Sequence, residues 1–500
     1  MKKKNVLMIN PLASPKMAYD GPPLSLLSVV SMLDEKKYNI HIVDWHDKDY
    51  EKKIRELSRA SDICGITCMT GYQILTMLQA AKIVKQENPN INLICGGAHP
   101  TLMPEQTLNN SLIDIVVIGQ GQRAFAELVE ALSKKRDISK IKGLGFKKNG
   151  KKVFTEERKN EDINNFPILP YHLLENFENY LVETSFAKKT LYYLTSAGCT
   201  GNCKFCGEES LHHRKWNCLS IQRVIDDIKM LKQKYNFEGV AITDSNFYVN
   251  EKRVAEFCRK MIPLKLKWGC TSGRPDQLKR YSDETLSLMQ QSGLNDIFLG
   301  VEAADNKTLE LMSKGCTIQD SLEILPRLKK YGIRAQCSFI IGVPGVDVRK
   351  DFKSTMQLIN KLRRDKLASQ FHLFVYTPLP GTKFLEEASR LGYKIPETLE
   401  GWTHYEFHAH TTPWIPKKYA QFTDAASIYF MFLAGHAQKV VKSVVPKYLL
   451  LPALITERFM YLISKFRISA SCFLLPVDYY LIKWVIMHKN KLFRGKKLLF

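Results

Sequence analysis

The sequence predicts an α/β protein with an N-terminal parallel sheet, a partial (βα)6 barrel and a helical C-terminal region. Of its 500 residues, 45% are hydrophobic and 25% are charged, an ordinary globular composition that excludes a wholly disordered chain. Short β-rich runs alternate with helical patterns in two separate stretches. The alternation stops near residue 394, and the rest of the chain has a helical, aromatic and basic pattern.

Residues 1–140 are expected to form a Rossmann-like domain. Helical stretches such as 72–87 and 122–133 separate its strand candidates, which are 6–9, 39–43, 63–67, 91–95 and 115–118. Strands that alternate with helices favour a parallel sheet covered on both faces. Ligands of such sheets bind beyond the carboxyl ends of the strands, and here those ends carry Gly96, Gly97, Gly119 and Gly121.

Residues 141–187 are polar and irregular, and we expect a linker or a short extension of the sheet. The alternation then resumes and predicts a barrel over residues 188–394. Its strand candidates are 191–195, 239–243, 266–270, 296–300, 335–341 and 370–376. This number of βα units fits a partial barrel better than a complete eight-fold one. Residues 395–500 are expected to be mainly helical.

A cluster of three cysteines, Cys199, Cys203 and Cys206, directly follows the first barrel strand in a glycine-containing loop. Zinc would need a fourth ligand, for which His212 or Cys218 are the candidates in this alternative. Three thiolates on a four-iron cluster instead leave one iron open to a small molecule, as catalysis requires. The chain shows no signal peptide, since the apolar run 6–9 is too short for one. Disulfides are therefore not expected, and clustered cysteines indicate metal or cluster ligands.

From this loop onward the chain resembles the radical SAM superfamily, whose signature Cys-x-x-x-Cys-x-aromatic-Cys is complete here with Phe205 at the aromatic position. The resemblance covers about residues 190–390 and continues through Asp244-Ser-Asn-Phe247, Trp268-Gly-Cys-Thr-Ser-Gly-Arg274, Gly300-Val-Glu302, Gly342-Val-Pro-Gly345 and Pro380-Gly-Thr382. It implies that the three cysteines hold a 4Fe–4S cluster whose open iron chelates S-adenosylmethionine. One electron would cleave that molecule to a 5′-deoxyadenosyl radical, which abstracts hydrogen from the substrate.

The resemblance also implies a set of residues around S-adenosylmethionine. Phe205 would line the adenine site, while Arg274 and Glu302 would meet the ribose or methionine groups from their strand ends. The remaining members of this implied set are Asp244, Gly342 and Pro344. A structural ion pair at the barrel rim is the alternative role for Arg274 and Glu302.

The N-terminal region looks like the cobalamin-binding domain that precedes many radical SAM barrels. The similarity lies in Cys95-Gly-Gly-Ala-His-Pro-Thr-Leu-Met-Pro104, in Ile115-Val-Val-Ile-Gly-Gln-Gly121 and near the start of the chain. It implies that cobalamin is bound by Thr67, Gly96, Gly97, Gly119 and Gly121. Glycines at strand ends let a large flat ring approach the backbone. The motif Asp-x-His-x-x-Gly of domains that coordinate cobalt through histidine is absent, so we expect His99 to pack behind the pocket.

One departure concerns Gln120 and Gln122, where the family usually has Gly-Glu-Gly-Glu. Glutamine keeps the side-chain length but loses the charge and exchanges an acceptor for donors. The alternative is therefore a Rossmann-like domain that has lost its cofactor. A second alternative is the RNA methylthiotransferase arrangement, in which Cys64, Cys68 and Cys95 would hold another cluster. It is disfavoured because the C-terminus lacks a β-rich RNA-binding pattern.

The net charge of +23 is concentrated at the C-terminus, where residues 436–500 hold twelve Lys or Arg and two acidic residues, Glu457 and Asp478. Apolar, aromatic segments beside a basic cluster are typical of a helix in an anionic membrane interface. A helical cap on the barrel with a solvated basic end is the alternative, and no nucleic acid partner is expected. No window is apolar enough to predict a spanning helix, so we expect a cytoplasmic protein, peripheral at the inner membrane face.

Together the motifs predict a cobalamin-dependent radical SAM enzyme that methylates an unactivated carbon of a small or lipid-like substrate. The resemblance extends to the anaerobic Mg-protoporphyrin monomethyl ester cyclase and hopanoid methylase group, so oxidative cyclisation or rearrangement without methyl transfer is the alternative outcome. A reductant such as flavodoxin or ferredoxin is the expected electron donor. A non-enzymatic cobalamin- or membrane-binding protein is disfavoured by the intact cysteine triad.

Overall fold

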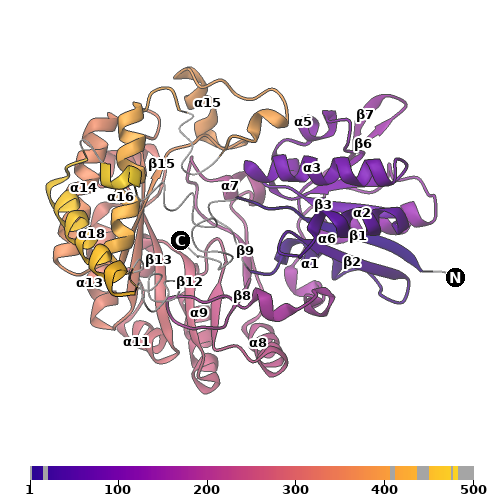
Figure 1. Ribbon diagram of the computed structural model, residues 1–500. Coiled ribbons are helices and arrows are strands. Elements are labelled where there is room, and N and C mark those ends of the chain that lie inside the picture. The colour runs from indigo at the N-terminus through magenta and orange to yellow at the C-terminus, as the bar shows by residue number, and fades with distance from the viewer. Residues whose placement is uncertain are drawn as a thin grey trace.

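The computed structural model describes residues 3–14, 21–405, 412–435, 438, 450–473 and 477–481. Two sheets form the framework of this part of the chain, the N-terminal sheet at the right of Figure 1 and the barrel at the left. The α/β class, the two parallel sheets and the helical C-terminal region predicted from the sequence are confirmed.

Within the described residues the N-terminal sheet has seven strands in the order β2-β1-β3-β4-β5-β6-β7. Five parallel strands, β1 (Lys4–Asn10), β2 (Tyr38–Asp44), β3 (Ile63–Thr67), β4 (Asn92–Gly96) and β5 (Ile115–Val117), are followed by antiparallel β6 (Leu144–Lys148) and β7 (Lys151–Phe154). The sheet thus continues past residue 140. In this doubly wound order the strand sequence reverses between β1 and β3, and ligands of such sheets bind there, beyond the carboxyl ends.

Helices cover both faces of the N-terminal sheet because its strands are apolar on both sides. One face packs against α2 (Tyr50–Ala60), α3 (Tyr72–Glu87) and α5 (Pro104–Asn109). The other face packs against α1 (Leu24–Val30) and α6 (Gly121–Ser133). The short α4 (Ala98–Leu102) directly follows β4 at the carboxyl edge.

The barrel sheet, counted over the described residues, has six parallel strands in the order β15-β14-β13-β12-β11-β8. They are β8 (Thr190–Tyr193), β11 (Gly239–Ile242), β12 (Lys267–Gly273), β13 (Leu294–Glu302), β14 (Arg334–Ile341) and β15 (Gln370–Val375). A small antiparallel pair, β9 (Ser196–Gly198) and β10 (Trp216–Cys218), follows the first strand. The predicted partial barrel is confirmed, and it stays open between β8 and β15.

The barrel helices begin where the sequence supplies polar caps. A side-chain oxygen of Ser220, Asn250, Ser282, Asp305, Thr317 or Asp347 accepts a hydrogen bond from the first turn of the helix that follows it. The capped helices are α8 (Ile221–Tyr235), α9 (Glu251–Met261), α11 (Asp283–Gln291), α12 (Asn306–Leu311), α13 (Ile318–Lys330) and α14 (Val348–Arg364); α7 (Gly207–His212), α10 (Pro275–Leu278) and α15 (Lys383–Arg390) lack such a bond.

The C-terminal region adds two long helices to the outside of the barrel. α16 (Lys417–Leu433) packs along β15, and α18 (Leu450–Ala470) packs on α16 and α14 (Figure 1). α16 thereby covers the edge strand of the open barrel. Of the described helices, none is long and apolar enough to cross a membrane.

Before reaching α16 the chain returns to the N-terminal domain. Trp402 is buried in the apolar core beside α3, and its indole N–H donates to Oε1 of Gln106 at 2.9 Å. Nearby, Gln106 donates to the Pro396 carbonyl at 2.8 Å and Asn110 to Oε1 of Glu400 at 2.6 Å. Segment 396–402 therefore joins the end of the barrel to the N-terminal domain.

We predict that Trp402→Ala lowers the free energy of unfolding of the N-terminal domain by about 3–5 kcal/mol, because a large buried ring leaves a cavity and Gln106 loses a partner. Urea unfolding followed by circular dichroism checks this. Leu391→Ala, at a side chain 43% exposed, is the control and is expected to cost less than about 0.5 kcal/mol. Equal effects of the two substitutions would contradict the packing role of Trp402.

Candidate functional site

The cysteine loop lies between β9 and α7, at the carboxyl end of the first barrel strand. Cys199, Cys203 and Cys206 are all partly exposed. Gly198 begins the loop with φ +83°, and a Cβ there would stand 2.1 Å from the Lys215 carbonyl oxygen. Only glycine fits that approach. The N–H of Cys206 donates to the carbonyl of Cys203 at 3.1 Å, so the second half of the loop is a tight turn.

Asp244 holds the start of this loop. It is 1% exposed and follows β11, and its carboxylate accepts from the backbone N–H and hydroxyl of Thr195 at 2.6 and 2.5 Å and from the Ser196 hydroxyl at 2.6 Å. Burial raises the pKa of the Asp244 carboxyl, and these hydrogen bonds oppose that shift. The structure therefore places Asp244 behind the loop, as the group that positions the residues before Cys199.

The sulfurs receive hydrogen bonds from three elements. Cys199 Sγ accepts from the Gly201 backbone N–H and from Nδ2 of Asn246, each at 3.3 Å, and Cys203 Sγ accepts from Nη1 of Arg274 at 3.4 Å. Burial raises the pKa of the Cys206 thiol to about 12, so its thiolate needs a metal or a cation for compensation. Donors aimed at sulfur tune iron–sulfur clusters, so this loop fits the group implied by the sequence.

Among the described residues, no three His, Cys, Asp or Glu side chains converge on the position of a single metal ion. In a four-iron cluster each cysteine binds a different iron, so the thiols stand farther apart than the ligands of one ion. Cys218 lies on β10 opposite Ser196, and His212 is paired with Glu208 at 3.7 Å. Cys64, Cys68 and Cys95 are buried in the N-terminal core.

A buried chain of charges runs from the cysteine loop across the barrel. Arg274 Nε pairs with Oδ1 of Asp276 at 3.1 Å, and Arg274 Nη2 donates to the Lys314 carbonyl. Lys314 Nζ in turn pairs with Oε1 of Glu302 at 3.0 Å and lies 5.8 Å from the ring centre of Phe205. Arg274 and Glu302 thus each form a structural ion pair, the alternative role considered from the sequence, and Lys314 links the two pairs.

Glu302 has a backbone conformation that side-chain-bearing residues rarely adopt. Its φ is +66°, unusual for a residue with a side chain, and Ser338 donates to its second carboxylate oxygen at 3.2 Å. A Cβ on Gly300 would stand 2.4 Å from Glu302 Oε1 and 2.8 Å from Lys314 Nζ. The glycine in Gly300-Val-Glu302 therefore makes room for this ion pair.

Gly342 and Pro344 lie in the loop after β14. Gly342 has φ +79°, donates its N–H to Oδ2 of Asp351 at 2.8 Å and accepts the Trp414 indole N–H on its carbonyl at 2.9 Å. Trp414, which follows the barrel in the sequence, therefore supports this loop. His408 and His410, which precede it in the sequence, lie outside the described residues.

A cavity of about 470 Å³ lies between the N-terminal domain and the start of the barrel. All five residues predicted for cobalamin line it: Thr67, Gly96, Gly97, Gly119 and Gly121. Its other walls come from the linker, including Phe166 and Leu169, and from barrel residues next to the cysteine loop, including Ala197 and Leu211. His99 is fully buried and does not line the cavity; its Nδ1 lies 2.9 Å from the Thr70 hydroxyl.

Glycines at the strand ends shape one wall of the cavity. Gly119 has φ +78°, and a Cβ there would meet nothing within 4 Å, so the strand end borders open space. Gly97 has φ +110°, and a Cβ there would stand 2.8 Å from the Cys68 carbonyl oxygen, so the turn requires glycine. The lining is mainly apolar, as in most cofactor sites.

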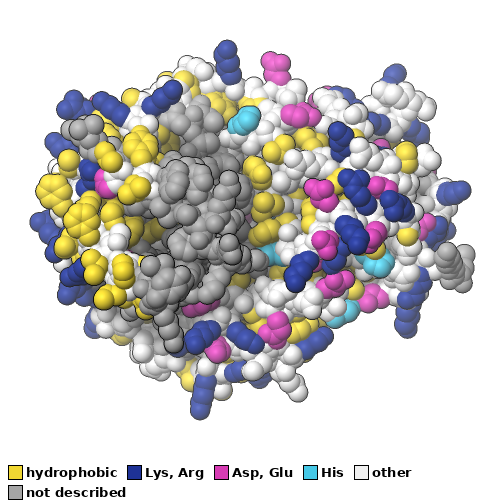
Figure 2. Space-filling model, in the orientation of Figure 1, with side chains coloured by type: hydrophobic (Ala, Val, Ile, Leu, Met, Phe, Trp, Pro, Cys, Tyr) yellow, Lys and Arg dark blue, Asp and Glu magenta, His cyan; other side chains and the backbone are white. Residues whose placement is uncertain are grey.

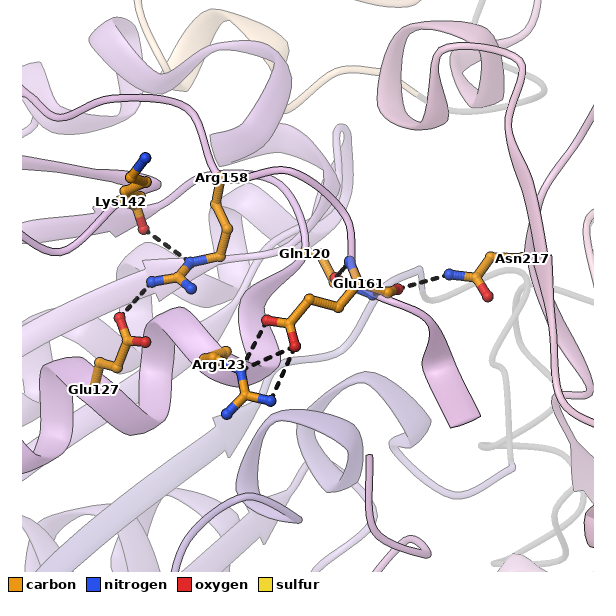
Figure 3. A network of polar contacts seen from close by, with 7 residues as sticks. All are labelled: Gln120, Arg123, Glu127, Lys142, Arg158, Glu161 and Asn217. Atoms are coloured by element: carbon orange, nitrogen blue, oxygen red, sulfur yellow. Dashed lines mark hydrogen bonds and ion pairs between the residues drawn. The ribbon is translucent and has the colours of Figure 1, made fainter. Parts of the chain in front are cut away.

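Hydrogen bonds to the linker account for the glutamine at position 120. Its amide donates to the Glu161 carbonyl at 3.1 Å and accepts from the Glu161 N–H at 2.6 Å, and Asn217 of β10 donates to the same carbonyl at 2.7 Å (Figure 3). A glutamate could accept but not donate here. The departure from the family pattern therefore matches a hydrogen-bond pair within this chain.

The same segment is held by ion pairs. Arg123 of α6 donates to both carboxylate oxygens of Glu161 at 2.8, 2.9 and 3.0 Å. Arg158 donates to Glu127, also on α6, and to the Lys142 carbonyl at 3.2 Å (Figure 3). The linker is therefore fixed along one wall of the cavity.

Sequence reasoning missed three members of this site: Asn246, Lys314 and Arg253. Asn246 is buried, and among the described residues nothing hydrogen-bonds its Oδ1, which leaves an acceptor beside Cys199. Arg253 donates to Thr195 and to the Leu219 carbonyl. The signals in the sequence were the asparagine within Asp244-Ser-Asn-Phe247 and the Lys314-Gly315 pair after α12.

Known proteins are similar to both halves of this site. A family model described as the radical SAM superfamily matches residues 193–359, and one described as the B12 binding domain matches residues 14–129. An uncharacterized methyltransferase of Pyrococcus horikoshii is 33% identical over 380 residues, which cover 74% of this chain and 78% of the relative.

Two further proteins are similar over most of the chain. An anaerobic magnesium-protoporphyrin IX monomethyl ester cyclase of Rubrivivax gelatinosus is 27% identical over 405 residues, covering 78% of this chain and 70% of the cyclase. The solved structure of OxsB, a cobalamin-dependent S-adenosylmethionine radical enzyme with aqua-cobalamin bound, has a TM-score of 0.70 at 17% identity over 98% of this chain and 76% of its own. The latter is a likeness of fold.

We predict that Gln120→Glu loosens the linker whereas Gln122→Glu does not. Gln120 donates to the Glu161 carbonyl, which a carboxylate cannot do, so Gln120→Glu leaves that carbonyl to Asn217 alone and sets two acceptor oxygens against each other. Gln122 donates to the Ser28 hydroxyl at 2.8 Å, and a hydroxyl can reverse its role and donate to a carboxylate. Limited proteolysis of segment 155–165 and thermal unfolding compare the two variants. Similar cleavage rates would contradict this account of Gln120.

We predict that Asp351 makes stability fall as the pH rises from about 4 to 6. Burial raises the pKa of Asp351 from 3.8 to about 6, and Asp305 adds to the shift while the Gly342 N–H opposes it. Because the folded state then binds the proton more tightly than the unfolded state, stability decreases across this window and is level above it.

Asp351→Asn keeps an acceptor for Gly342 and removes the buried charge, so its stability should lack this slope, and its stability relative to the wild type should rise between pH 4 and 6. Denaturant unfolding at pH 5 and pH 8 measures the difference. An unchanged slope in the variant would assign the pH dependence to another group.

Proposed function

Because the chain belongs to the radical SAM superfamily and carries a B12 binding domain, we propose that it transfers a methyl group to an unactivated carbon of a small or lipid-like molecule. The predicted family, enzyme class and cofactors, namely a 4Fe–4S cluster, S-adenosylmethionine and cobalamin, are confirmed by these similarities. The observation that carries the proposal is the cavity that the B12 binding domain shares with the residues beside the cysteine loop.

When bound, the cluster supplies the electron that cleaves S-adenosylmethionine, and cobalamin supplies the methyl group. Cys199, Cys203 and Cys206 would hold the cluster, while Asn246 and Arg274 donate to their sulfurs. The protein's contribution is position and the exclusion of water.

The charges around the loop suit a zwitterionic ligand. Glu302, which already pairs with Lys314 and accepts from Ser338, would accept a hydrogen bond from an amino or hydroxyl group of the ligand. The cations Arg274 and Lys314 would face a carboxylate of the ligand. Phe205 would pack on the adenine, and Gly342 and Pro344, in the loop after β14, would contribute another part of the same site. Asp244 would act by positioning the loop.

Thr67, Gly96, Gly97, Gly119 and Gly121 would bind cobalamin through backbone atoms and the Thr67 hydroxyl. The linker, held to Gln120, would lie along the ring. A corrin in this cavity would lie next to the cysteine loop, which is the neighbourhood that methyl transfer to a substrate radical needs.

Oxidative cyclisation is the second candidate, favoured by the similarity to the magnesium-protoporphyrin IX monomethyl ester cyclase. For either reaction we propose a one-electron donor of the flavodoxin or ferredoxin kind. The enzyme would act in the cytoplasm, in peripheral contact with the inner membrane face through residues 436–500.

We predict that anaerobic reconstitution gives about four irons and one cobalt per chain, and that Cys203→Ala loses the iron and S-adenosylmethionine cleavage while keeping the cobalt. Metal analysis and the absorption spectrum measure both cofactors. Cys218→Ala is the matched control and should retain full iron, because Cys218 lies on β10 outside the loop.

The reaction itself is tested with S-adenosylmethionine carrying a deuterated methyl group and extracts of candidate substrates. Methylation yields S-adenosylhomocysteine, 5′-deoxyadenosine and a labelled product. Formation of 5′-deoxyadenosine alone, with unlabelled product, would reject methylation in favour of cyclisation or rearrangement.

A further inference from the structure

The outermost helix on the barrel, α18, exposes its apolar side and turns a partly polar side toward the protein. Its buried residues are Glu457, Met460, Ser464 and Ile468, two of them polar. Its most exposed apolar residues are Leu451 (70%), Ile455 (62%), Phe459 (62%), Leu462 (52%) and Phe466 (66%). A helix on a water-facing surface shows the opposite arrangement, with its apolar side toward the protein.

These five exposed residues form one continuous surface, called here the α18 face. Their spacing of four, four, three and four residues returns to the same side of a helix at each step. Figure 2 shows an apolar patch over α18, at the left of the molecule, with Lys and Arg side chains along its outer edge. Val477, Tyr480 and Leu481, which are also more than half exposed, add to the exposed apolar surface of the C-terminal region. Large contiguous apolar patches mark interaction sites.

The charges on α18 are asymmetric. Arg458 and Lys465 are exposed and stand seven residues apart, so they follow one edge of the α18 face. The acidic residue of the helix, Glu457, is buried on the opposite side. α14, on which α18 packs, ends with Lys361, Arg363 and Arg364 in its last turn. The charged residues of α18 that border the α18 face, Arg458 and Lys465, are therefore cationic and complement an anionic surface.

The α18 face is held outward by fixed contacts. Asn360 donates to the Ile468 carbonyl at 2.9 Å, and Arg363 donates to the Ser469 hydroxyl at 2.6 Å. These bonds attach the C-terminal end of α18 to α14. Arg467 pairs with both carboxylate oxygens of Asp478 at 2.6 and 3.0 Å. The helix cannot turn its apolar side inward without breaking these bonds.

From this arrangement we propose that α18 docks the protein on an anionic lipid bilayer, lying in the interface with the α18 face in the acyl region and Arg458 and Lys465 at the phosphates. A one-sided apolar helix with cations at its edge is the pattern of interfacial helices. Phosphate-level cations add attraction to anionic lipid within about a Debye length. The inference deepens the peripheral localisation of the proposed function and is independent of the radical chemistry.

The test is co-sedimentation of the reconstituted full chain with phosphatidylcholine vesicles. One set of vesicles is neutral, and the other contains roughly 30 mol% phosphatidylglycerol as the anionic lipid. We expect binding to the anionic vesicles, weakened by salt. Phe459→Gln with Phe466→Gln should reduce the partition coefficient roughly tenfold or more. Arg458→Gln with Lys465→Gln should reduce the preference for anionic lipid and its salt dependence.

The matched control is Met230→Gln with Leu391→Gln, which removes apolar side chains that are 44% and 43% exposed away from α18, and should bind as the wild type does. No binding by the wild type would overturn the proposal, as would equal binding by the Phe459/Phe466 variant, which would assign attachment to another segment. If the wild type forms a dimer that this variant disrupts, and the wild type does not bind vesicles, then the α18 face contacts a second copy of the chain and the proposal is wrong.

Cleavage of S-adenosylmethionine is measured on each variant without vesicles. Normal cleavage with lost vesicle binding separates docking from the chemistry. Conversely, a wild type that binds vesicles but cleaves nothing would reject the proposed function while leaving α18 docking intact.

Discussion

The position of the cysteine loop depends on the buried carboxylate of Asp244. Its oxygens accept from Thr195 and Ser196, so the end of β11 fixes the backbone that leads from β8 to Cys199. Trp216 adds a second tie, since its indole N–H lies within reach of the Ser196 hydroxyl and the Asn246 carbonyl. Because desolvating a carboxylate is costly, this anchor persists only while every one of its partners stays in place. The end of β11 thus fixes the backbone at the start of the loop.

A second constraint, the hydrogen bonds of the linker, fixes the N-terminal domain relative to the barrel. The Glu161 carbonyl accepts from Gln120 of one domain and from Asn217 of the other, so a single peptide group in the linker contacts both. On the far side Trp402 returns to the N-terminal core. The cavity borders the first of these contacts, and neither domain can shift without breaking hydrogen bonds at one or the other. Two cofactors that must react at close range need a spacing held in this way.

The sequence predicted the local parts of the site well and its long-range contacts poorly. The cysteine triad and the strand-end glycines are readable because each is a short motif whose spacing carries the chemistry. Lys314 was missed because its role depends on Glu302 and on Arg274, forty residues away in sequence. Gln120 looked like a loss of function because its partner, Glu161, lies in a linker without any motif. In each case the missing information was which residues the fold brings together.

α18 shows the same limit for packing. Its sequence reveals apolar and polar sides, but either side can face the protein, and the choice depends on what the neighbouring helices offer. Here Asn360 and Arg363 of α14 hold the C-terminal end of α18 through the Ile468 carbonyl and the Ser469 hydroxyl, which fixes the rotation of the helix with Phe459 and Phe466 outside. Figure 1 shows α18 on the side of the barrel opposite the N-terminal domain. A surface engaged there leaves the cobalamin cavity unobstructed, so attachment and cofactor loading impose no steric conflict on each other.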